Sequence, residues 1–156
     1  MISLKNMLYD SLFQLLDKIP HKELMDQYMH LIGYLSITPE VTLQKFLDSL
    51  QEIQSNGLIQ VAYTLEDGRF FLHGTATLHY ETKLSHGCHP VGHIEDVVVA
   101  PNYRNLGIAK KLIDILLCTA STTCYKVVLD CNEELIPVYA KCGFTPTGIH
   151  MSHRFL

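Results

Sequence analysis

Apolar residues recur at helical spacing in the first third of the chain. Leu4, Leu8, Leu12, Leu15 and Ile19 would share one face of a helix that ends at Pro20. A second helix is predicted over residues 22–35. A third is predicted to begin at Thr38, a possible N-cap followed by Pro39, and to end at Asn56-Gly57. The pattern therefore predicts three helices in this third of the chain. It predicts no strand before residue 20.

The middle of the chain has strand patterns. Segments 58–65 and 70–80 flank Glu66-Asp67-Gly68-Arg69, in which Asp-Gly is typical of a hairpin turn. Residues 81–90 are predicted to form a polar loop. Residues 91–100 are predicted to form a strand that is apolar on both faces near its end, as in the centre of a sheet.

Helices and strands alternate in the last third. A helix is predicted up to about residue 120, because apolar residues from Ala109 to Leu117 recur at helical spacing. A short strand over 124–130, a short helix over 133–142 that Gly143 stops, and one or two strands over 144–154 should come after it. The order predicts one mixed α/β domain, and 156 residues suffice for one domain with a real core.

The loop over residues 102–110 joins the Val97-Val98-Val99 strand to the helix after it. A helix N-terminus has unpaired N–H groups and the positive end of the helix dipole, which suit a phosphate. The loop reads Arg-x-x-Gly-x-Ala, at Arg104, Gly107 and Ala109. It lacks the Gly-x-Gly-x-x-Gly of a dinucleotide fold and the Gly-Lys-Ser/Thr of a P-loop. By itself it fits a plain connection equally well.

Composition narrows the function classes. An apolar content of 47% and a charged content of 18% are typical of a globular protein. No run of about 18 apolar residues predicts a membrane span. The net charge of −4 argues against broad nucleic-acid binding, although a local site for a small anion can still be positive.

The cysteines and histidines suggest neither disulfides nor a metal. Five cysteines without a CxxC pair, after an N-terminus without a secretory pattern, favour reduced thiols and a cytoplasmic protein. His86, Cys88, His89 and His93 form the densest group of metal-ligating residues. We favour a polar loop there over a zinc site.

Two adjacent carboxylates, Glu95 and Asp96, interrupt an apolar strand. Neighbouring strand residues point to opposite faces, so the pair cannot act together unless a bulge intervenes. A buried carboxylate there would hold its proton more tightly and could serve as a general base near neutral pH. The alternative is a pair of salt-bridged carboxylates at a sheet edge.

Three further side chains could take part in chemistry. Tyr139, on the short helix, could donate a proton to a leaving group or simply pack in the core. Asp130 ends a strand and could cap the next helical turn. Arg154 could bind an anion or lie in a solvated tail. A cysteine nucleophile at Cys124 or Cys131 is not favoured, because no histidine accompanies either in a known pattern.

These motifs resemble the GNAT acetyltransferase superfamily and, more closely, the eukaryotic glucosamine-6-phosphate N-acetyltransferases. The superfamily motif Arg/Gln-x-x-Gly-x-Gly/Ala is matched by Arg104, Gly107 and Ala109. The closer likeness lies in segments 92–99, 124–131, 138–144 and 151–155, and it extends from about Thr38 to the C-terminus.

The resemblance implies a GNAT fold over residues 1–156. That fold is a mixed, mostly antiparallel sheet with a splayed central pair of parallel strands and helices on both faces. Here residues 1–37 are expected to be a divergent helical segment in place of the family's first strand. The resemblance also implies a homodimer whose two subunits share the site, with the C-terminal arginine coming from the partner.

The implied reaction is transfer of the acetyl group of acetyl-CoA to the C2 amine of glucosamine 6-phosphate. The products are N-acetylglucosamine 6-phosphate and CoA, in UDP-N-acetylglucosamine biosynthesis, by direct attack in a ternary complex. One alternative is an acetyltransferase for another small amine or a peptide amine. A second is a noncatalytic acyl-CoA-binding module.

The resemblance also assigns residues. The Asp130 carbonyl, with Glu95 or Asp96, would accept the amine proton, and Tyr139 would protonate the CoA thiolate. The expected acetyl-CoA contacts are Val97, Val98, Val99, Arg104, Asn105, Leu106, Gly107, Ile108, Ala109, Lys110, Asp130 and Tyr139. The expected sugar contacts are Thr38, Lys83, Leu84, Ser85, His86, Glu95, Asp96, Val97, Tyr125, Lys126 and Arg154. Leu84 stands where relatives tend to carry an aromatic residue, and Pro137 lies close before Tyr139.

Overall fold

The computed structural model describes residues 6–155, and a five-stranded sheet with the order β1-β2-β3-β4-β5 forms its centre. The strands are β1 (Leu8–Ser11), β2 (Gly57–Glu66), β3 (Arg69–Glu81), β4 (Val91–Val99) and β5 (Lys126–Val128). Neighbours from β1 to β4 run antiparallel, whereas β5 runs parallel to β4. The predicted mixed, mostly antiparallel sheet is confirmed.

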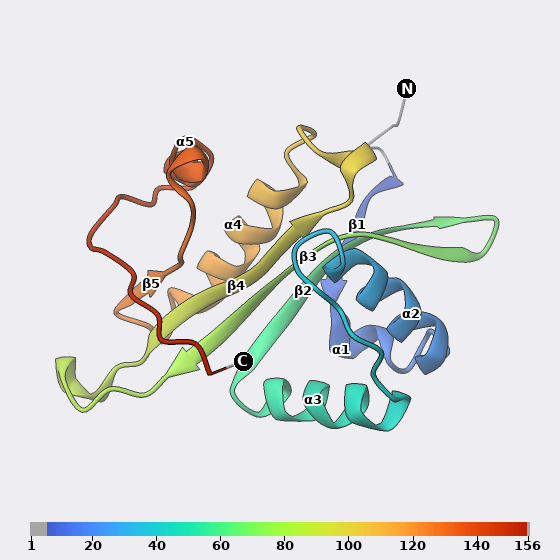
Figure 1. The fold of residues 1–156 in the computed structure, drawn as a ribbon, viewed down its shortest axis with the longest axis horizontal. Coiled ribbons are helices and arrows are strands. Elements are labelled where there is room, and N and C mark those ends of the chain that lie inside the picture. Colours follow the sequence, from blue (N-terminus) through green and yellow to red (C-terminus); the bar gives the residue numbers. More distant parts are fainter. Residues whose placement is uncertain (1–5, 156) are drawn as a thin grey trace.

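Helices cover both faces of this sheet (Figure 1). They are α1 (Leu12–Leu15), α2 (His21–Ile32), α3 (Leu43–Ser55), α4 (Ile108–Ala120) and α5 (Ile136–Ala140), with short 3-10 turns at His86–Cys88, Pro101–Tyr103 and Glu133–Leu135. The helices α1, α2 and α3 share one hydrophobic core with the sheet, and α4 forms a second core on the opposite face. None of the helices within residues 6–155 has both the length and the apolar character needed to cross a bilayer.

Strand alternation assigns side chains to the two cores. On β2, Ile59 and Val61 lie in the core of α1, α2 and α3, whereas the next residue, Ala62, lies in the core of α4. The face of α4 that is buried carries Ile108, Leu112, Ile113 and Leu116, all at most 1% exposed. Burial of both faces explains why apolar residues predominate in the middle of β2 and at the end of β4.

The chain begins its sheet with a strand that the hydrophobic pattern did not predict. Residues from Leu8 to Ser11 pair with β2 between Tyr63 and Gln60, and the Tyr63 hydroxyl donates to Asp10 Oδ2 at 2.6 Å. Ser11 Oγ then accepts from the Phe13 N–H at 3.3 Å and caps α1. The predicted long helix is therefore wrong here, because a four-residue edge strand depends on its partner and carries little pattern of its own. Leu4, also assigned to that helix, lies outside the described residues.

The third helix begins later than predicted. Thr42, and not Thr38, is the N-cap of α3, since Thr42 Oγ1 accepts from the Lys45 N–H at 3.2 Å. The predicted end at Asn56 is confirmed. The β2–β3 hairpin is also confirmed, with Asp67 and Gly68 at φ values of 50° and 77°, as a tight type I′ turn requires.

The predicted final strands are wrong for this single chain. Residues 144–155 contain no strand, and the short strand predicted over 124–130 is reduced to β5, residues 126–128. Figure 1 shows the C-terminal segment, in red, crossing in front of the sheet as an irregular loop. The outer edge of β5 is consequently unpaired within residues 6–155.

Gly57, at the start of β2, has no room for a side chain. A Cβ atom added there would lie 2.4 Å from the Leu78 carbonyl oxygen, which belongs to the backbone of β3. Gly57→Ala should therefore lower the free energy of unfolding by about 1–3 kcal/mol, as overpacking does. Urea denaturation measures this, with Gly148→Ala as control because a Cβ there meets no atom within 4 Å. Equal stability of the two variants would contradict the close packing.

Candidate active site

β4 and β5 separate partway along their length. They pair only from Val91 to His93 on β4 and from Lys126 to Val128 on β5. Beyond His93, β4 continues to Val99 with no strand on that side within the described residues. Backbone N–H and C=O groups on this open edge can pair with an extended ligand. The predicted splay of the parallel pair is thus confirmed.

A bulge lies in β4 where the splay opens. Thr75 of β3 is the partner of Val98, and Thr77 is the partner of Glu95. Two residues of β4, Asp96 and Val97, therefore lie between these pairs where β3 has one, Ala76. Asp96 lies inside the bulge with a φ of 51°, in the left-handed region that non-glycine residues rarely adopt.

The bulge places Glu95 and Asp96 on the same face of the sheet. Ile94 and Val97, on either side of the pair, pack in the core of α4. Val98 packs in the core of α1, α2 and α3. Strict alternation would bury one of the two carboxylates, but both are exposed. The two carboxylates therefore share the face of the sheet that α2 and α3 cover. The sequence analysis allowed this arrangement only if a bulge intervened, and the bulge is present.

The expectation that one of these carboxylates is buried is wrong. Both side chains are exposed, so the buried environment expected for a general base here is absent. The alternative of a salt-bridged pair is also not observed, since neither carboxylate forms an ion pair among the described residues. Two free anionic groups thus stand together beside the open edge of β4.

The N-terminus of α4 lies directly after the open strand. Gly107 is its N-cap, with a φ of 81°, and Asn105 is also left-handed at 61°. The backbone N–H groups of residues 105–110 donate no hydrogen bond to any described residue. The first that does belongs to Lys111, which donates to Gly107 O at 3.0 Å. Free N–H groups at the positive end of a 13-residue helix form a site for an anion.

The predicted acetyl-CoA contacts divide into structural and accessible groups. Ile108, Val98 and Val99 are buried in the cores. The Arg104 side chain is directed to the backbone, with Nε donating to Val99 O at 3.0 Å, and so holds the loop against β4. Lys110 pairs with Asp114 at 2.7 Å, and this hydrogen bond raises its pKa. The remaining contacts in this segment, Val97, Asn105, Leu106, Gly107 and Ala109, are half-buried or exposed.

Tyr139 lies on α5, packed edge-to-face on Phe144 with ring centroids 6.4 Å apart. Its half-burial raises its pKa, and the neighbouring thiols of Cys131 and Cys142 add to the shift. The phenol therefore keeps its proton at neutral pH and can donate it. Pro137 lies in the first turn of α5, where a missing N–H costs nothing, and does not break the helix.

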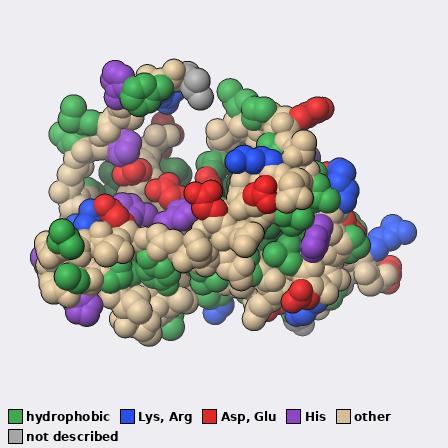
Figure 2. Space-filling view, turned by 90° about the horizontal axis from the view of Figure 1, so that it is seen from below, with side chains coloured by type: hydrophobic (Ala, Val, Ile, Leu, Met, Phe, Trp, Pro, Cys, Tyr) green, Lys and Arg blue, Asp and Glu red, His purple; other side chains and the backbone are tan. Residues whose placement is uncertain are grey.

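Asp130 follows β5 and is exposed. Its Oδ2 lies 3.0 Å from Nδ1 of His150, which belongs to the C-terminal segment. In Figure 2 this segment arches over a hollow whose floor carries acidic and histidine side chains. The sequence had not indicated His150, because an isolated exposed histidine carries no pattern.

Polar residues near the splay form a connected group. Glu81 bonds to Lys83 through Oε1 and to His93 Nε2 at 2.7 Å through Oε2. These two hydrogen bonds lower the pKa of Glu81, and the bond from Lys83 has the larger effect. Glu81 and His93 were not predicted as site residues. The signal that could have indicated them is their position, at the end of β3 and near the start of β4, because these strand ends lie side by side.

Tyr125, directly before β5, is in contact with two other predicted sugar-binding residues. The His86 ring stacks on Tyr125, with centroids 4.1 Å apart, and Lys126 Nζ lies 5.6 Å from the centre of the same ring. The structure thus brings His86, Tyr125 and Lys126 together. The ammonium group of Lys126 beside the His86 ring offers hydrogen-bond donors that suit a phosphate.

Other predicted sugar contacts are not brought into this group. Leu84 is 94% exposed, and Ser85 and Arg154 are exposed as well. Thr38 is half-buried beside Gly33, on the loop between α2 and α3. That loop runs over the same face of the sheet as the two carboxylates (Figure 1).

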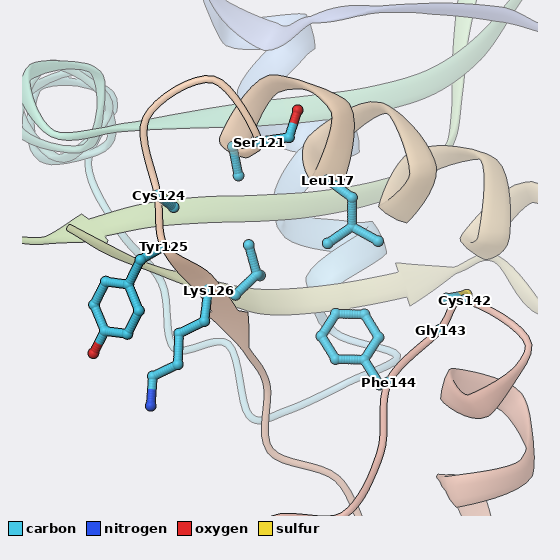
Figure 3. A pocket seen from close by; sticks show the side chains of 10 residues that line it. Leu117, Ser121, Cys124, Tyr125, Lys126, Cys142, Gly143 and Phe144 are labelled. Atoms are coloured by element: carbon cyan, nitrogen blue, oxygen red, sulfur yellow. The ribbon is translucent and has the colours of Figure 1, made fainter. Parts of the chain in front are cut away.

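A separate hollow of about 440 Å³ lies at the outer edge of β5, away from the splay. In Figure 3 the Leu117 side chain points toward the Phe144 ring, whereas Tyr125 and Lys126 point away. The lining residues are Leu117, Ala120, Ser121, Cys124, Tyr125, Lys126, Val127, Cys142, Gly143 and Phe144. The hollow therefore lies between the C-terminal end of α4, β5 and residues 142–144.

The five cysteines are free thiols. Within residues 6–155, no three histidine, cysteine or acidic side chains converge as metal ligands would. Cys142 is partly buried, and this burial raises the pKa of its thiol. The histidine-rich loop over 86–93 instead makes the stacking and ion-pair contacts described above.

Comparison with known proteins agrees with this geometry. The family model described as the acetyltransferase (GNAT) family matches residues 21–144. Glucosamine 6-phosphate N-acetyltransferase from Arabidopsis thaliana is 36% identical over 146 residues, which cover 88% of this chain and 96% of the relative. The enzyme of the same name from Trypanosoma brucei brucei is 34% identical over 77% of this chain and 82% of its own length.

A solved structure agrees over nearly the whole chain. The crystal structure of glucosamine-6-phosphate N-acetyltransferase from Arabidopsis thaliana superimposes with a TM-score of 0.83 at 30% identity. The match covers 97% of this chain and 99% of that one. The predicted GNAT fold is therefore confirmed. The expected helical replacement of its first strand is wrong, because β1 pairs with β2. The chain belongs to the GNAT acetyltransferase family and, within it, to the glucosamine 6-phosphate N-acetyltransferases.

Proposed function

We propose that this protein transfers the acetyl group of acetyl-CoA to the C2 amine of glucosamine 6-phosphate. The products are N-acetylglucosamine 6-phosphate and CoA, and the reaction serves UDP-N-acetylglucosamine biosynthesis in the cytosol. The observation that carries the proposal is the 36% identity to a glucosamine 6-phosphate N-acetyltransferase over 88% of the chain. The free thiols fit a reducing compartment.

The residues present fit acetyl-CoA. The open edge of β4 beyond His93 offers unpaired backbone groups to an extended, amide-containing arm. The free N–H groups of residues 105–110 offer an anion site for phosphate groups at the end of that strand. Acetyl-CoA supplies the activated acetyl thioester, and the chain supplies the surface that orients it.

The two carboxylates of the bulge serve the amine. An amine attacks a thioester only as the neutral base, so the site must bind the ammonium form and then accept its proton. Glu95 and Asp96 are unpaired anions on one face beside the splay. With the backbone carbonyl of Asp130, which follows β5 across the splay, they orient the amine and accept the proton.

Tyr139 serves the leaving group. Because its half-burial raises its pKa, the phenol is protonated at neutral pH. It can therefore donate a proton or a hydrogen bond to the departing thiolate. The attack is direct, in a ternary complex, without an acetylated protein side chain.

Hydrogen-bond donors at the entrance serve the sugar phosphate. Lys126 and His86 gather on Tyr125, and Lys83 lies nearby in the loop after β3. Arg154 would add a planar guanidinium, which binds phosphate in a bidentate manner. We assign Thr38, Leu84 and Ser85 to the wall around the sugar.

We further infer a homodimer in which the C-terminal segment reaches the partner's site. Ile149, Met151 and Phe155 on this segment are 93%, 88% and 91% exposed. Such a row of apolar side chains is unfavourable in water and is typical of an interface. The unpaired edge of β5 and the hollow beside it offer a matching apolar surface on a second copy. Arg154, between Met151 and Phe155, would be carried into that copy.

The test of the activity is CoA release with three acceptors. The chain should release CoA with glucosamine 6-phosphate, more slowly with glucosamine, and at background rate with a peptide amine. No release with any acceptor would favour a noncatalytic acyl-CoA-binding module. Equal rates with and without the sugar phosphate would refute the phosphate site.

Tyr139→Phe should lose most turnover while acetyl-CoA still binds, because the ring keeps its packing on Phe144 but has no proton to donate. The expected loss in kcat is about 10²–10⁴-fold, the usual contribution of general acid catalysis. Steady-state kinetics together with calorimetric binding of acetyl-CoA measure both quantities. Tyr34→Phe is the control, since that hydroxyl hydrogen-bonds to His30 on α2 and is not assigned to the site. Near-normal turnover of Tyr139→Phe would remove Tyr139 from the reaction.

Arg154→Ala should mainly raise the KM for glucosamine 6-phosphate, because the lost guanidinium contacts the phosphate and not the reacting atoms. Loss of a hydrogen bond to a charged group predicts roughly a ten- to hundredfold rise. Arg69→Ala, at the exposed start of β3, is the charge-matched control. An unchanged KM would exclude Arg154 from the site.

Mixing the two impaired variants, at a glucosamine 6-phosphate concentration below the raised KM of Arg154→Ala, tests the shared site. If Arg154 enters the partner's site, a mixed dimer of Tyr139→Phe and Arg154→Ala contains one site with both native residues. Mixing should then restore activity above that of either variant alone. If each chain uses its own Arg154, both sites of the mixed dimer remain defective and nothing is regained.

A further inference from the structure

His93 on β4 and Glu81 on β3 form a hydrogen-bonded pair to which the proposed function gives no role. His93 Nε2 lies 2.7 Å from Glu81 Oε2, and the other carboxylate oxygen of Glu81 bonds to Lys83. These bonds lower the pKa of Glu81, so that it is ionised at neutral pH and can only accept. Nε2 of His93 must therefore carry the hydrogen. Nδ1 of the same ring has no hydrogen-bond partner among residues 6–155 and is available to a ligand.

Strand alternation places His93 on the same face of the sheet as Glu95. Ile94, between the two, is buried in the core of α4, so its neighbours point to the opposite face. Glu81 points to that opposite face as well, because Tyr80 before it packs in the core of α4. The His93 side chain is 34% exposed there. Figure 2 shows acidic and histidine side chains together on the floor of the hollow.

Lys126 of β5 lies on this face too, at the other side of His93. It pairs with Val91 of β4, two residues before His93. Val127, the next residue, packs in the core of α4, so Lys126 points to the opposite face. Along β4, His93 is two residues from the position of this pair and two residues from Glu95, about 7 Å in each direction. His93 thus stands midway between a proposed phosphate-binding side chain and a proposed amine-binding one.

Glucosamine 6-phosphate has its groups in the same order. Its amine is on C2, and its phosphate is carried by C6, which is attached to C5 on the opposite side of the ring. The hydroxyls of C3 and C4 lie along the edge between them. A sugar with its phosphate near Lys126 and its amine near Glu95 can therefore place these hydroxyls over His93.

We propose that His93, oriented by Glu81, binds the C3 or C4 hydroxyl of the amino sugar through Nδ1. Glu81 is then a positioning residue, since it fixes the ring and its tautomer without touching the sugar. A site that hydrogen-bonds a substrate hydroxyl discriminates against analogues that lack it. The inference rests on the proposed function and adds to it a residue that determines specificity for the sugar ring.

His93→Leu tests the contact, because it removes both ring nitrogens and keeps an apolar side chain. The kcat/KM for glucosamine 6-phosphate should fall about three- to tenfold, the loss expected for one hydrogen bond between uncharged groups. His93→Asn should regain part of this loss, since its amide lies close to the place of Nδ1. The calorimetric Kd for acetyl-CoA should stay unchanged in both variants. Wild-type kcat/KM in His93→Leu would refute this inference alone, whereas no CoA release by the unmodified protein would refute the proposed function with it.

His79→Leu is the matched control. His79 pairs directly with His93 on the same face of the sheet, and its other partner is Gly57 of β2. It therefore lies on the side of His93 that is away from the splay. His79→Leu should keep wild-type kcat/KM. A similar loss in both variants would overturn the proposal, because the effect would then be a general one on this strand pair.

Deoxy acceptors identify the contact itself. The unmodified protein should lose activity with glucosamine 6-phosphate that lacks either the C3 or the C4 hydroxyl. With that acceptor, His93→Leu should lose nothing further. Multiplied losses with both acceptors would overturn the proposal. If His93→Leu does not fold, the unmodified protein still gives the test, since undiminished kcat/KM with both deoxy acceptors would overturn it.

Glu81→Gln tests the orienting contact. The amide keeps the shape of the carboxylate but accepts a weaker hydrogen bond from Nε2 of His93. The KM for glucosamine 6-phosphate should rise while kcat stays unchanged. In the His93→Leu background the same substitution should cost less. An equal cost in both backgrounds would assign the effect of Glu81 to Lys83 alone and refute its role on His93.

Discussion

The separation of β4 from β5 is the constraint on which the rest of the site depends. A sheet normally pairs the backbone groups of every inner strand, but β5 follows β4 for only three residues. The extra residue in β4 then bends the strand and turns Asp96 to the face that already carries Glu95. One local irregularity thus provides both an open strand edge for a ligand and two carboxylates beside it.

Packing on both faces makes this irregularity tolerable. Val98 and Ile94, just outside the bulge, are anchored in opposite cores, at 5% and 2% exposure. The α4 helix is fixed by a fully buried face, so that its free N-terminus always lies at the end of the open strand. The rigid parts of the fold therefore hold the acyl donor's side of the site, as preorganised catalysis requires.

The acceptor's side is built from looser parts. The loop over 81–90 and the C-terminal segment carry the exposed predicted sugar contacts Leu84, Ser85, His86 and Arg154, and none of these belongs to either core. The bond between His150 and Asp130 is one link between this segment and the sheet. A second copy that covers the apolar C-terminal residues would complete what one chain leaves open.

The sequence by itself determined the elements whose signals are local. The α4 helix, its glycine N-cap, the Asp67-Gly68 hairpin and the apolar central strand all depend on residues close to one another in the chain. Tyr139 and the anion-binding loop could also be predicted, because their motifs are short and contiguous. The resemblance to acetyltransferases rested on such segments.

Only the tertiary structure decided the features that depend on a distant partner. The strand β1 exists because β2 offers it an edge, whereas residues 144–155 form no strand and leave the outer edge of β5 unpaired within the described residues. Glu95 and Asp96 share a face because of a mismatch with β3, which lies some twenty residues earlier. The hydrophobic periodicity of a segment shows which of its side chains are buried. It does not show which residues of another segment they pair with or pack against, because that depends on both segments.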